Sequence, residues 1–431
     1  MKWSLAIVAA AVLAVAAVSR RLTGTPVTPA MAFVAIGLLA GPLVFDDISI
    51  SPSSHAVRTL AEATLAVVLF SDASRIKMRA LAREYAVPLR LLGIGLPLTI
   101  AAGALAAVAV LHDLNLIDAL VLAIVLAPTD AALGQAVVTE PSLPSRIRQG
   151  LNVESGLNDG ICVPLLLLAL AAAETDANAT TSQHALKIVS EQIGYGILGG
   201  VVAGLASAAV VRVSGARDLI SKPWLQVIPV AGAGLAYGIA LALGGSGFIA
   251  AFVAGGLFGY LVPHESEQSS LLAEEVGGLL GGVTFLVFGA ILLGPTLEHL
   301  SLSAAVYAVL SLTVVRMLPV AIAMIGSDAS PRTIGFLGWF GPRGLASIVF
   351  AVIVADEAHL PGTGTILTAT YATIGLSVFA HGLTAAPLAR RYAAWYGAHA
   401  LGGQRLMEGV AAAHHRPRGA AHIDAAPDAV R

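Results

Sequence analysis

The chain has 431 residues, of which 57% are hydrophobic and only 12% are charged, and its formal net charge is −2 at pH 7. With 45 glycines and a mean hydropathy of +0.84, this composition excludes an ordinary soluble protein and predicts an all-α polytopic membrane protein. The near-zero charge gives no indication of a nucleic-acid partner, and we expect none. The single Cys162 excludes an intramolecular disulfide framework.

Apolar segments of about 20 residues, the length that crosses a bilayer, recur along the whole chain. We predict about thirteen transmembrane helices, at residues 3–19, 26–44, 57–73, 86–111, 116–139, 146–173, 189–213, 223–243, 246–262, 271–293, 302–325, 332–355 and 363–389. Lys2 and the first apolar segment resemble a signal peptide. Because Arg20 and Arg21 follow that segment at once and further helices follow, we expect a retained helix.

The basic residues between these helices predict the orientation. Most of them follow odd-numbered helices, whereas the opposite side has only Lys2, Arg58 and Lys187. Cytoplasmic loops carry the excess of Lys and Arg, so we expect a multi-pass plasma-membrane protein with its N-terminus outside and its C-terminus in the cytoplasm. This arrangement requires an odd number of helices, as predicted. Residues 396–431 are expected to form a short disordered cytoplasmic tail.

Two of the predicted helices are interrupted near their middles. The helix at 116–139 contains Pro-Thr-Asp at 128–130, and the helix at 332–355 contains Gly-Pro-Arg-Gly at 341–344. Pro removes a backbone donor and Gly tolerates unwound backbone, so both helices are expected to break at mid-membrane depth. They are seven helices apart, as expected for two six-helix halves. Interruptions at corresponding positions of two halves indicate the substrate site of a secondary transporter.

Two acidic residues, Glu154 and Asp159, lie within the predicted helix at 146–173. An ionised side chain at the bilayer centre costs about 2.5–3.5 kcal/mol on insertion scales, so both are functional candidates. Ser155 lies four residues before Asp159 and therefore on the same helix face. At about 1.5 Å of rise per residue, Asp159 is about 20 Å from the inner face and Asp130 about 21 Å from the outer face. We therefore expect both near the midplane.

Two arginines within the predicted helices are candidate partners for these acids. Arg316, in the helix at 302–325, lies at the predicted depth of Glu154, so we favour a structural ion pair between them. Arg343, which is predicted to lie nearer the centre of the membrane, is the alternative partner. Otherwise, Arg343 is expected to counter the half-helix ends or Asp130. Asp159 is then the acid available to the transported ion, where a proton and a metal cation compete for one carboxylate.

These motifs resemble those of the NhaP/NHE-type monovalent cation/proton antiporters. The resemblance rests on the Pro-Thr-Asp at 128–130, the Glu-Ser-x-x-Asn-Asp at 154–159, Arg316 and the Gly-Pro-Arg-Gly at 341–344. It implies the NhaA/NapA/NhaP-like fold, with two inverted six-helix repeats and crossed discontinuous helices. It also implies a core bundle that moves against a dimerisation bundle. The antiporter domain would cover residues 1–395, with a core that includes about 86–173 and 302–355 and a dimerisation bundle formed by the remaining helices.

The same resemblance implies the roles of the site residues. Asp159 binds both the cation and the proton, together with Asp130, Ser155, the backbone of Thr129 and Glu154. The supporting residues are Asn158, Arg316 and Arg343. Asn158, where other members have Asp, resembles the electroneutral branch, which exchanges one proton for one cation. No cofactor is implied, and the expected partners are Na⁺, Li⁺ or K⁺, protons, membrane lipid and a second copy of the chain.

Three other classes of function fit the sequence less well than exchange does. A channel requires a pore with rings or filters of polar groups, which the sequence does not show. An intramembrane enzyme with Ser155 as nucleophile and His381 as base places the two groups in distant helices, and His381 is expected to be a packed histidine. A transporter of an organic substrate is the strongest rival, but a site dominated by carboxylates favours a small cation. The sequence leaves open which cation is preferred, including a K⁺/H⁺ antiporter of the same fold.

Overall fold

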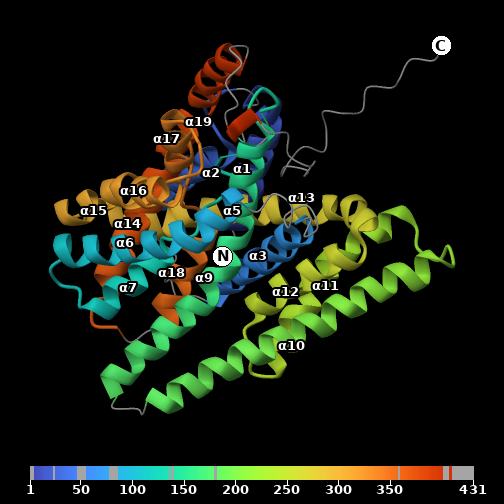
Figure 1. Ribbon diagram of the computed structural model, residues 1–431. Helices are drawn as coiled ribbons and strands as arrows, with labels where there is room; N and C mark the ends of the chain where they lie inside the picture. The colour runs from blue at the N-terminus through green and yellow to red at the C-terminus, as the bar shows by residue number, and fades with distance from the viewer. Residues whose placement is uncertain are drawn as a thin grey trace.

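The computed structural model describes residues 4–22, 25–45, 55–76, 86–134, 137, 140–178, 182–357, 360–400 and 407–409 (Figure 1). All regular elements in these ranges are helical. The first half contains α1 (Ser4–Leu22), α2 (Pro29–Phe45), α3 (His55–Ser74), α5 (Ala86–Arg90), the π-helical turn η1 (Leu91–Gly95), α6 (Leu96–Val110), α7 (Leu116–Val125) and α9 (Ser145–Asn178).

A long helix, α10 (Ser182–Gly215), leads into the second half. That half contains α11 (Lys222–Ala242), α12 (Gly247–Leu261), α13 (Pro263–Val287), the π-helical turn η2 (Phe288–Leu293), α14 (Gly294–Glu298), α15 (Leu302–Leu312), α16 (Val314–Ala323), α17 (Pro331–Trp339), α18 (Leu345–Glu357), α19 (Thr363–Ala400) and the 3₁₀ turn η3 (Met407–Gly409). Each of the thirteen predicted helices has a helical counterpart in the described residues.

The lengths and compositions of these helices agree with a protein that crosses a membrane several times. In the described chain, eight helices are long and apolar enough to cross a bilayer, and four shorter apolar helices accompany them. Apolar side chains such as Leu5, Leu39 and Leu105 are largely exposed, as expected for surfaces that face lipid rather than water.

The contacts between helices divide them into two groups. In Figure 1, α6, α7, α15 and α16 lie at the left, and α10, α11 and α12 lie at the lower right. We name the helices of residues 86–178 and 302–400 the core bundle, because α6 packs on α7, α15 and α16, while α19 contacts α15 and α18. We name those of residues 4–74 and 182–298 the scaffold bundle, because α10, α11 and α12 pack together and α3 contacts both α12 and α13. Helix α9 contacts elements of both groups, including α7, α10 and α3. A side chain on α9 can therefore face either bundle.

Helix α19 extends beyond the end that hydropathy predicts, and the predicted tail at 396–431 begins inside it. Tyr392 stacks on Phe336 of α17 with ring centroids 4.4 Å apart, and Arg332 lies 5.4 Å from the ring of Trp395. These contacts stabilise the helix where its sequence is no longer uniformly apolar. Further along, the buried Glu408 accepts a hydrogen bond from the Ser330 amide at 2.9 Å, so the turn at 407–409 docks at the start of α17.

Helices α12 and α3 approach each other so closely that two positions of α12 require glycine. A Cβ atom at Gly255 or Gly259 would overlap the backbone carbonyl oxygens of Phe70 and Ser74, respectively. We expect Gly259→Ala to destabilise the protein by about 1–3 kcal/mol, because the two backbones must separate to make room. Thermal unfolding in detergent measures the loss. The matched control is Gly256→Ala, where a Cβ meets open space. Equal stability of the two variants would contradict the prediction.

A candidate cation site at a helix crossing

The helix predicted at 116–139 does break at its Pro-Thr-Asp motif. Helix α7 ends at Val125, and residues 127–130 are unwound, because Pro128 lacks the backbone donor that would continue the helix. The second predicted break is present as well, since residues 340–344 between α17 and α18 are not helical. The Asp130 amide donates a hydrogen bond to the Pro342 carbonyl oxygen at 2.8 Å. The two unwound segments therefore cross and contact each other.

Opposite charges compensate the helix ends at this crossing. The Arg343 guanidinium donates to the carbonyl oxygens of Ala127 at 2.6 Å and Pro128 at 3.3 Å, just beyond the C-terminal end of α7. In return, Asp130 accepts a hydrogen bond from the amide of Leu345, the first residue of α18, at 3.1 Å. Helix C-termini carry partial negative charge and N-termini partial positive charge, so each side chain opposes the end that it contacts. Arg343 thus counters a half-helix end, one of its two expected roles.

Two glycines of the second break allow this close approach. A Cβ atom at Gly344 would overlap the Asp130 carboxylate, and one at Gly341 would overlap the guanidinium of Arg316. Glycine is therefore required for the packing of charged side chains against the unwound backbone.

Polar side chains of α9 fasten this helix to the first break. The Ser155 hydroxyl donates to the Thr129 carbonyl oxygen at 2.5 Å and accepts from the Ala131 amide at 2.7 Å. One turn along, the Asn158 side-chain amide donates to the Thr129 hydroxyl at 2.7 Å. A small cavity beside these bonds is lined by Thr129, Asp130 and Ser155, with Pro342 from the second break. Hydroxyl, carbonyl and carboxylate oxygens therefore converge at the crossing.

Asp159 lies one helical turn beyond Ser155 on the same face of α9, and only 8% of the residue is exposed. Four of the predicted site residues, Thr129, Asp130, Ser155 and Asn158, are joined at the crossing by hydrogen bonds with each other and with neighbouring backbone. In the described chain, no three His, Cys, Asp or Glu side chains converge as they would in a resident metal site. Hydroxyl, carbonyl and carboxylate oxygens are the ligands that hard cations prefer in proteins.

Glu154 and Arg316 form a separate, fully buried ion pair. The two guanidinium nitrogens Nη1 and Nη2 lie 2.6 and 2.9 Å from the two carboxylate oxygens, and both side chains are only 2% exposed. This is the partner that the predicted depths favoured, whereas Arg343 contacts the crossing instead. A bidentate pair of this kind satisfies both charges in low dielectric and connects α9 to α16.

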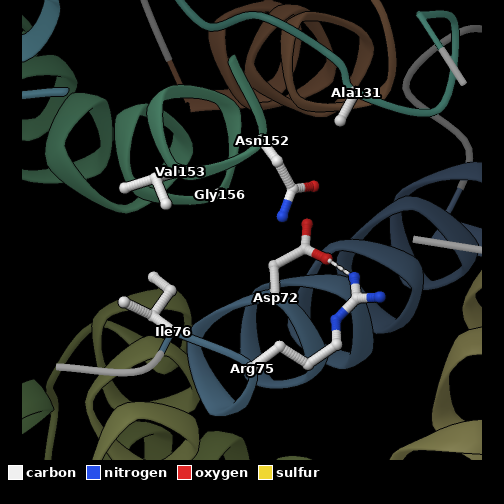
Figure 2. Close-up of a pocket in the computed structure, with 7 residues that line it drawn as sticks. All are labelled: Asp72, Arg75, Ile76, Ala131, Asn152, Val153 and Gly156. Carbon is white, nitrogen blue, oxygen red and sulfur yellow. Dashed lines mark hydrogen bonds and ion pairs between the residues drawn. The ribbon is translucent and has the colours of Figure 1, made fainter. Parts of the chain in front are cut away.

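Asp72, at the end of α3, was not among the residues predicted from the sequence. Figure 2 shows its carboxylate directed toward the side chain of Asn152 on α9, across a pocket that Ala131 also lines. Asp72 pairs with Arg75 at 2.6 Å, and Arg75 also pairs with Glu274 of α13 at 3.0 Å. The signal was present, because Asp72 is an acid in the last turn of an apolar helix. It was missed because its relation to α9 depends on packing between helices far apart in sequence.

Interrupted helices that cross beside buried carboxylates define the fold of a secondary transporter. The chain belongs to the sodium/hydrogen exchanger family, since the transmembrane model of that family matches residues 7–391. Among solved structures, the sodium proton antiporter MjNhaP1 from Methanocaldococcus jannaschii at pH 8 matches with a TM-score of 0.70 at 20% identity, over 88% of this chain and 98% of that chain. This likeness confirms the predicted NhaP-like fold.

Curated relatives carry the names of antiporters for two different cations. The K⁺/H⁺ antiporter NhaP2 of Shewanella sp. (strain ANA-3) is 27% identical over 399 residues, which are 89% of this chain and 66% of that protein. The probable Na⁺/H⁺ antiporter 2 of Methanocaldococcus jannaschii is 28% identical over 302 residues, 64% of this chain and 70% of that protein. The chain spans just under two thirds of the length of the Shewanella relative.

Proposed function

We propose that the protein exchanges protons for monovalent cations across the membrane, with one proton and one cation competing for Asp159. The observation that carries this proposal is the position of that carboxylate on α9, one turn from the Ser155 hydroxyl that contacts the unwound Thr129 carbonyl. Such a site offers a cation several oxygen ligands and offers a proton one basic group. Family membership and the two relatives named as antiporters support the same reaction.

Some of the site residues bind the transported ion, and the others hold these ligands in place. Asp159 carries the charge that is neutralised in turn by a proton or by a cation, while Ser155, Asp130 and the Thr129 carbonyl supply further oxygen ligands. Asn158 bonds to Thr129 and has no charge of its own to be neutralised. Glu154 is already neutralised by Arg316, and the charge of Asp130 is opposed by the N-terminus of α18, where the Leu345 amide donates to it. One exchangeable charge therefore favours a ratio of one proton to one cation and an electroneutral cycle.

Alternating access follows in this proposal from movement of the core bundle against the scaffold bundle. The ion site belongs to the core bundle, and Asp72 of the scaffold bundle lines a pocket with Asn152 and Ala131 at their boundary. We propose that the scaffold bundle forms the contact between two copies of the chain, that the N-terminus lies outside and that the C-terminus lies in the cytoplasm. The dimer is testable by cross-linking in membranes, and the orientation by labelling of cysteines placed at either end.

The experiment that tests the exchange is a pH-jump assay in proteoliposomes with Na⁺, Li⁺ and K⁺ in turn. We expect an alkali cation gradient to drive proton movement in the opposite direction, and an imposed voltage to leave the rate unchanged. Proton movement that never depends on any of the three cations would overturn the proposal. A rate that follows voltage would overturn the electroneutral ratio. The preferred cation decides between a Na⁺/H⁺ and a K⁺/H⁺ antiporter, since relatives of both names match the chain.

An ion pair connects the two bundles at the end predicted to face outside. Arg58, in the first turn of α3, pairs with Asp356 near the end of α18, and the side chains are 31% and 32% exposed. Pairs this exposed contribute up to about 1 kcal/mol, which is a factor of about five in an equilibrium. Because the pair holds the outer ends of α3 and α18 together, we expect Asp356→Asn to favour the outward-open state. The KM for external cation should fall by up to about fivefold.

The matched control for this prediction is Lys187→Gln. It removes an exposed pair with Glu191 that lies within α10 alone, on the same predicted side. We expect no change in KM from the control, because no contact between the bundles is lost. Identical transport kinetics of Asp356→Asn and the control would show that the Arg58 pair does not restrain the movement.

A further inference from the structure

Helix α19 supplies a chain of hydrogen bonds to the second break. The Ser377 hydroxyl oxygen accepts from the Arg343 backbone amide at 2.6 Å, and it lies 3.1 Å from Nδ1 of His381. The other ring nitrogen, Nε2, lies 2.9 Å from the carbonyl oxygen of Trp339. Ser377 and His381 are 0% and 1% exposed. Two side chains of α19 therefore hold both ends of the unwound segment between α17 and α18.

The donor or acceptor character of the neighbouring groups determines which atoms in this chain of hydrogen bonds carry protons. The Trp339 carbonyl can only accept, so Nε2 of His381 carries a proton and donates it. The Arg343 amide can only donate, so Ser377 uses a lone pair there and keeps its own proton to donate. In a neutral imidazole, Nδ1 is then the acceptor for the Ser377 hydroxyl. An imidazolium could donate from Nδ1 to the Ser377 carbonyl oxygen at 3.1 Å instead. That form adds a second buried cation beside Arg343, so the neutral ring is favoured.

We propose that His381 is a positioning residue for the exchange reaction, held neutral with its proton on Nε2. Its bonds fix the backbone from Trp339 to Arg343, and that segment in turn reaches the first break by two contacts. The Pro342 carbonyl accepts from the Asp130 amide, and the Arg343 guanidinium donates to the carbonyls of Ala127 and Pro128. His381 thus acts on the cation ligands through backbone, without contact with the ion. This inference rests on the proposed exchange function.

The expected effect on KM follows from how strongly transport depends on the alignment of the cation ligands. Ligands that are displaced by about 1 Å can cost about 100-fold in a reaction that depends on their alignment. His381→Leu removes both bonds of the ring. The Trp339 carbonyl then keeps only the Gly341 amide as a donor, and the Ser377 hydroxyl loses the acceptor for its own proton. We expect the KM for the transported cation to rise at least about tenfold. His381→Gln restores one donor and one acceptor, so its KM should stay within about twofold of that of the wild type.

The experiment compares these variants with Thr384→Val in proteoliposomes, with cation-driven proton movement recorded as a function of cation concentration and pH. Thr384 lies one turn beyond His381 on α19 and accepts from the indole of Trp339 at 3.0 Å, so it contacts the same residue without touching the backbone of the break. We expect the kinetics of Thr384→Val and the pH profile of His381→Gln to match those of the wild type. Where His381→Leu does not yield monodisperse protein, Ser377→Ala tests the same chain with a smaller change in volume and is expected to raise KM likewise.

Each alternative outcome is distinct. Unchanged KM in both His381→Leu and Ser377→Ala would overturn the positioning role. A shifted pH profile in His381→Gln would show that the histidine itself exchanges a proton, which contradicts a neutral ring. Equal damage in Thr384→Val would assign the effect to the packing of Trp339 and overturn the inference. Failure of the exchange function itself would appear differently, as wild-type protein without cation-driven proton movement.

Discussion

Asp159→Asn is expected to reduce cation-driven proton movement to the level of empty liposomes while the protein remains folded. The two side chains have nearly the same size, so the packing of α9 is preserved. The amide cannot bind the exchanged proton, and it lacks the negative charge that holds a cation against its hydration. The hydroxyl and carbonyl oxygens of Ser155 and Thr129 remain, but they have no net charge to exchange. The loss of one negative charge should therefore abolish exchange without unfolding the protein.

The measurement for this prediction combines transport with stability. We expect the wild type to be stabilised by its transported cation, by about 1.4 kcal/mol at ten times the dissociation constant, and this stabilisation to disappear in Asp159→Asn. The matched control is Asp113→Asn, which removes an exposed carboxylate in the connection between α6 and α7. The control should retain both transport and cation-dependent thermal stabilisation. Wild-type exchange by Asp159→Asn would exclude this carboxylate as the exchanged group.

Features encoded locally were predictable from the sequence. Proline and glycine cannot continue a helix in the way that other residues do, so the breaks at 127–130 and 340–344 were visible without any knowledge of packing. Depth along a helix is set by the rise per residue, which was enough to select Arg316 over Arg343 as the partner of Glu154. These predictions succeeded because each depends on a single helix or on one coordinate along the membrane normal.

Features that depend on the rotation of a helix about its axis, or on which helices lie beside it, were not predictable from the sequence. The sequence gives the depth of a side chain but leaves open which helix it faces. Asp72 was therefore overlooked, although it lines a pocket with Asn152. His381 was interpreted as a packed histidine because its apolar neighbours in sequence say nothing about Trp339, which lies 42 positions earlier. The extension of α19 beyond its apolar part likewise depends on aromatic contacts with α17, including that of Tyr392.

Glu154→Gln should have a large effect of a different kind, on stability more than on exchange. The Arg316 side chain is 2% exposed and its guanidinium is bound to both oxygens of Glu154, so neutralising the acid leaves a buried cation without its counter-charge. Breaking one partner of a buried pair typically costs about 3–5 kcal/mol. We expect a loss of this size in the free energy of unfolding in detergent. Exchange by the protein that remains folded should persist, because the cation ligands at the crossing are unchanged.

A second variant shows whether the effect of Glu154→Gln comes from the broken ion pair with Arg316 or from a direct role of Glu154 in transport. Replacing both members, as in Glu154→Gln with Arg316→Met, removes the uncompensated charge together with its partner. Because apolar side chains of similar volume often replace a buried ion pair at little cost, the double variant should regain most of the stability that Glu154→Gln loses. If Glu154→Gln instead keeps the wild-type unfolding free energy and loses exchange, Glu154 takes part in transport directly. The pair would then be a component of the ion pathway, and the electroneutral count of one exchangeable charge at Asp159 would be wrong.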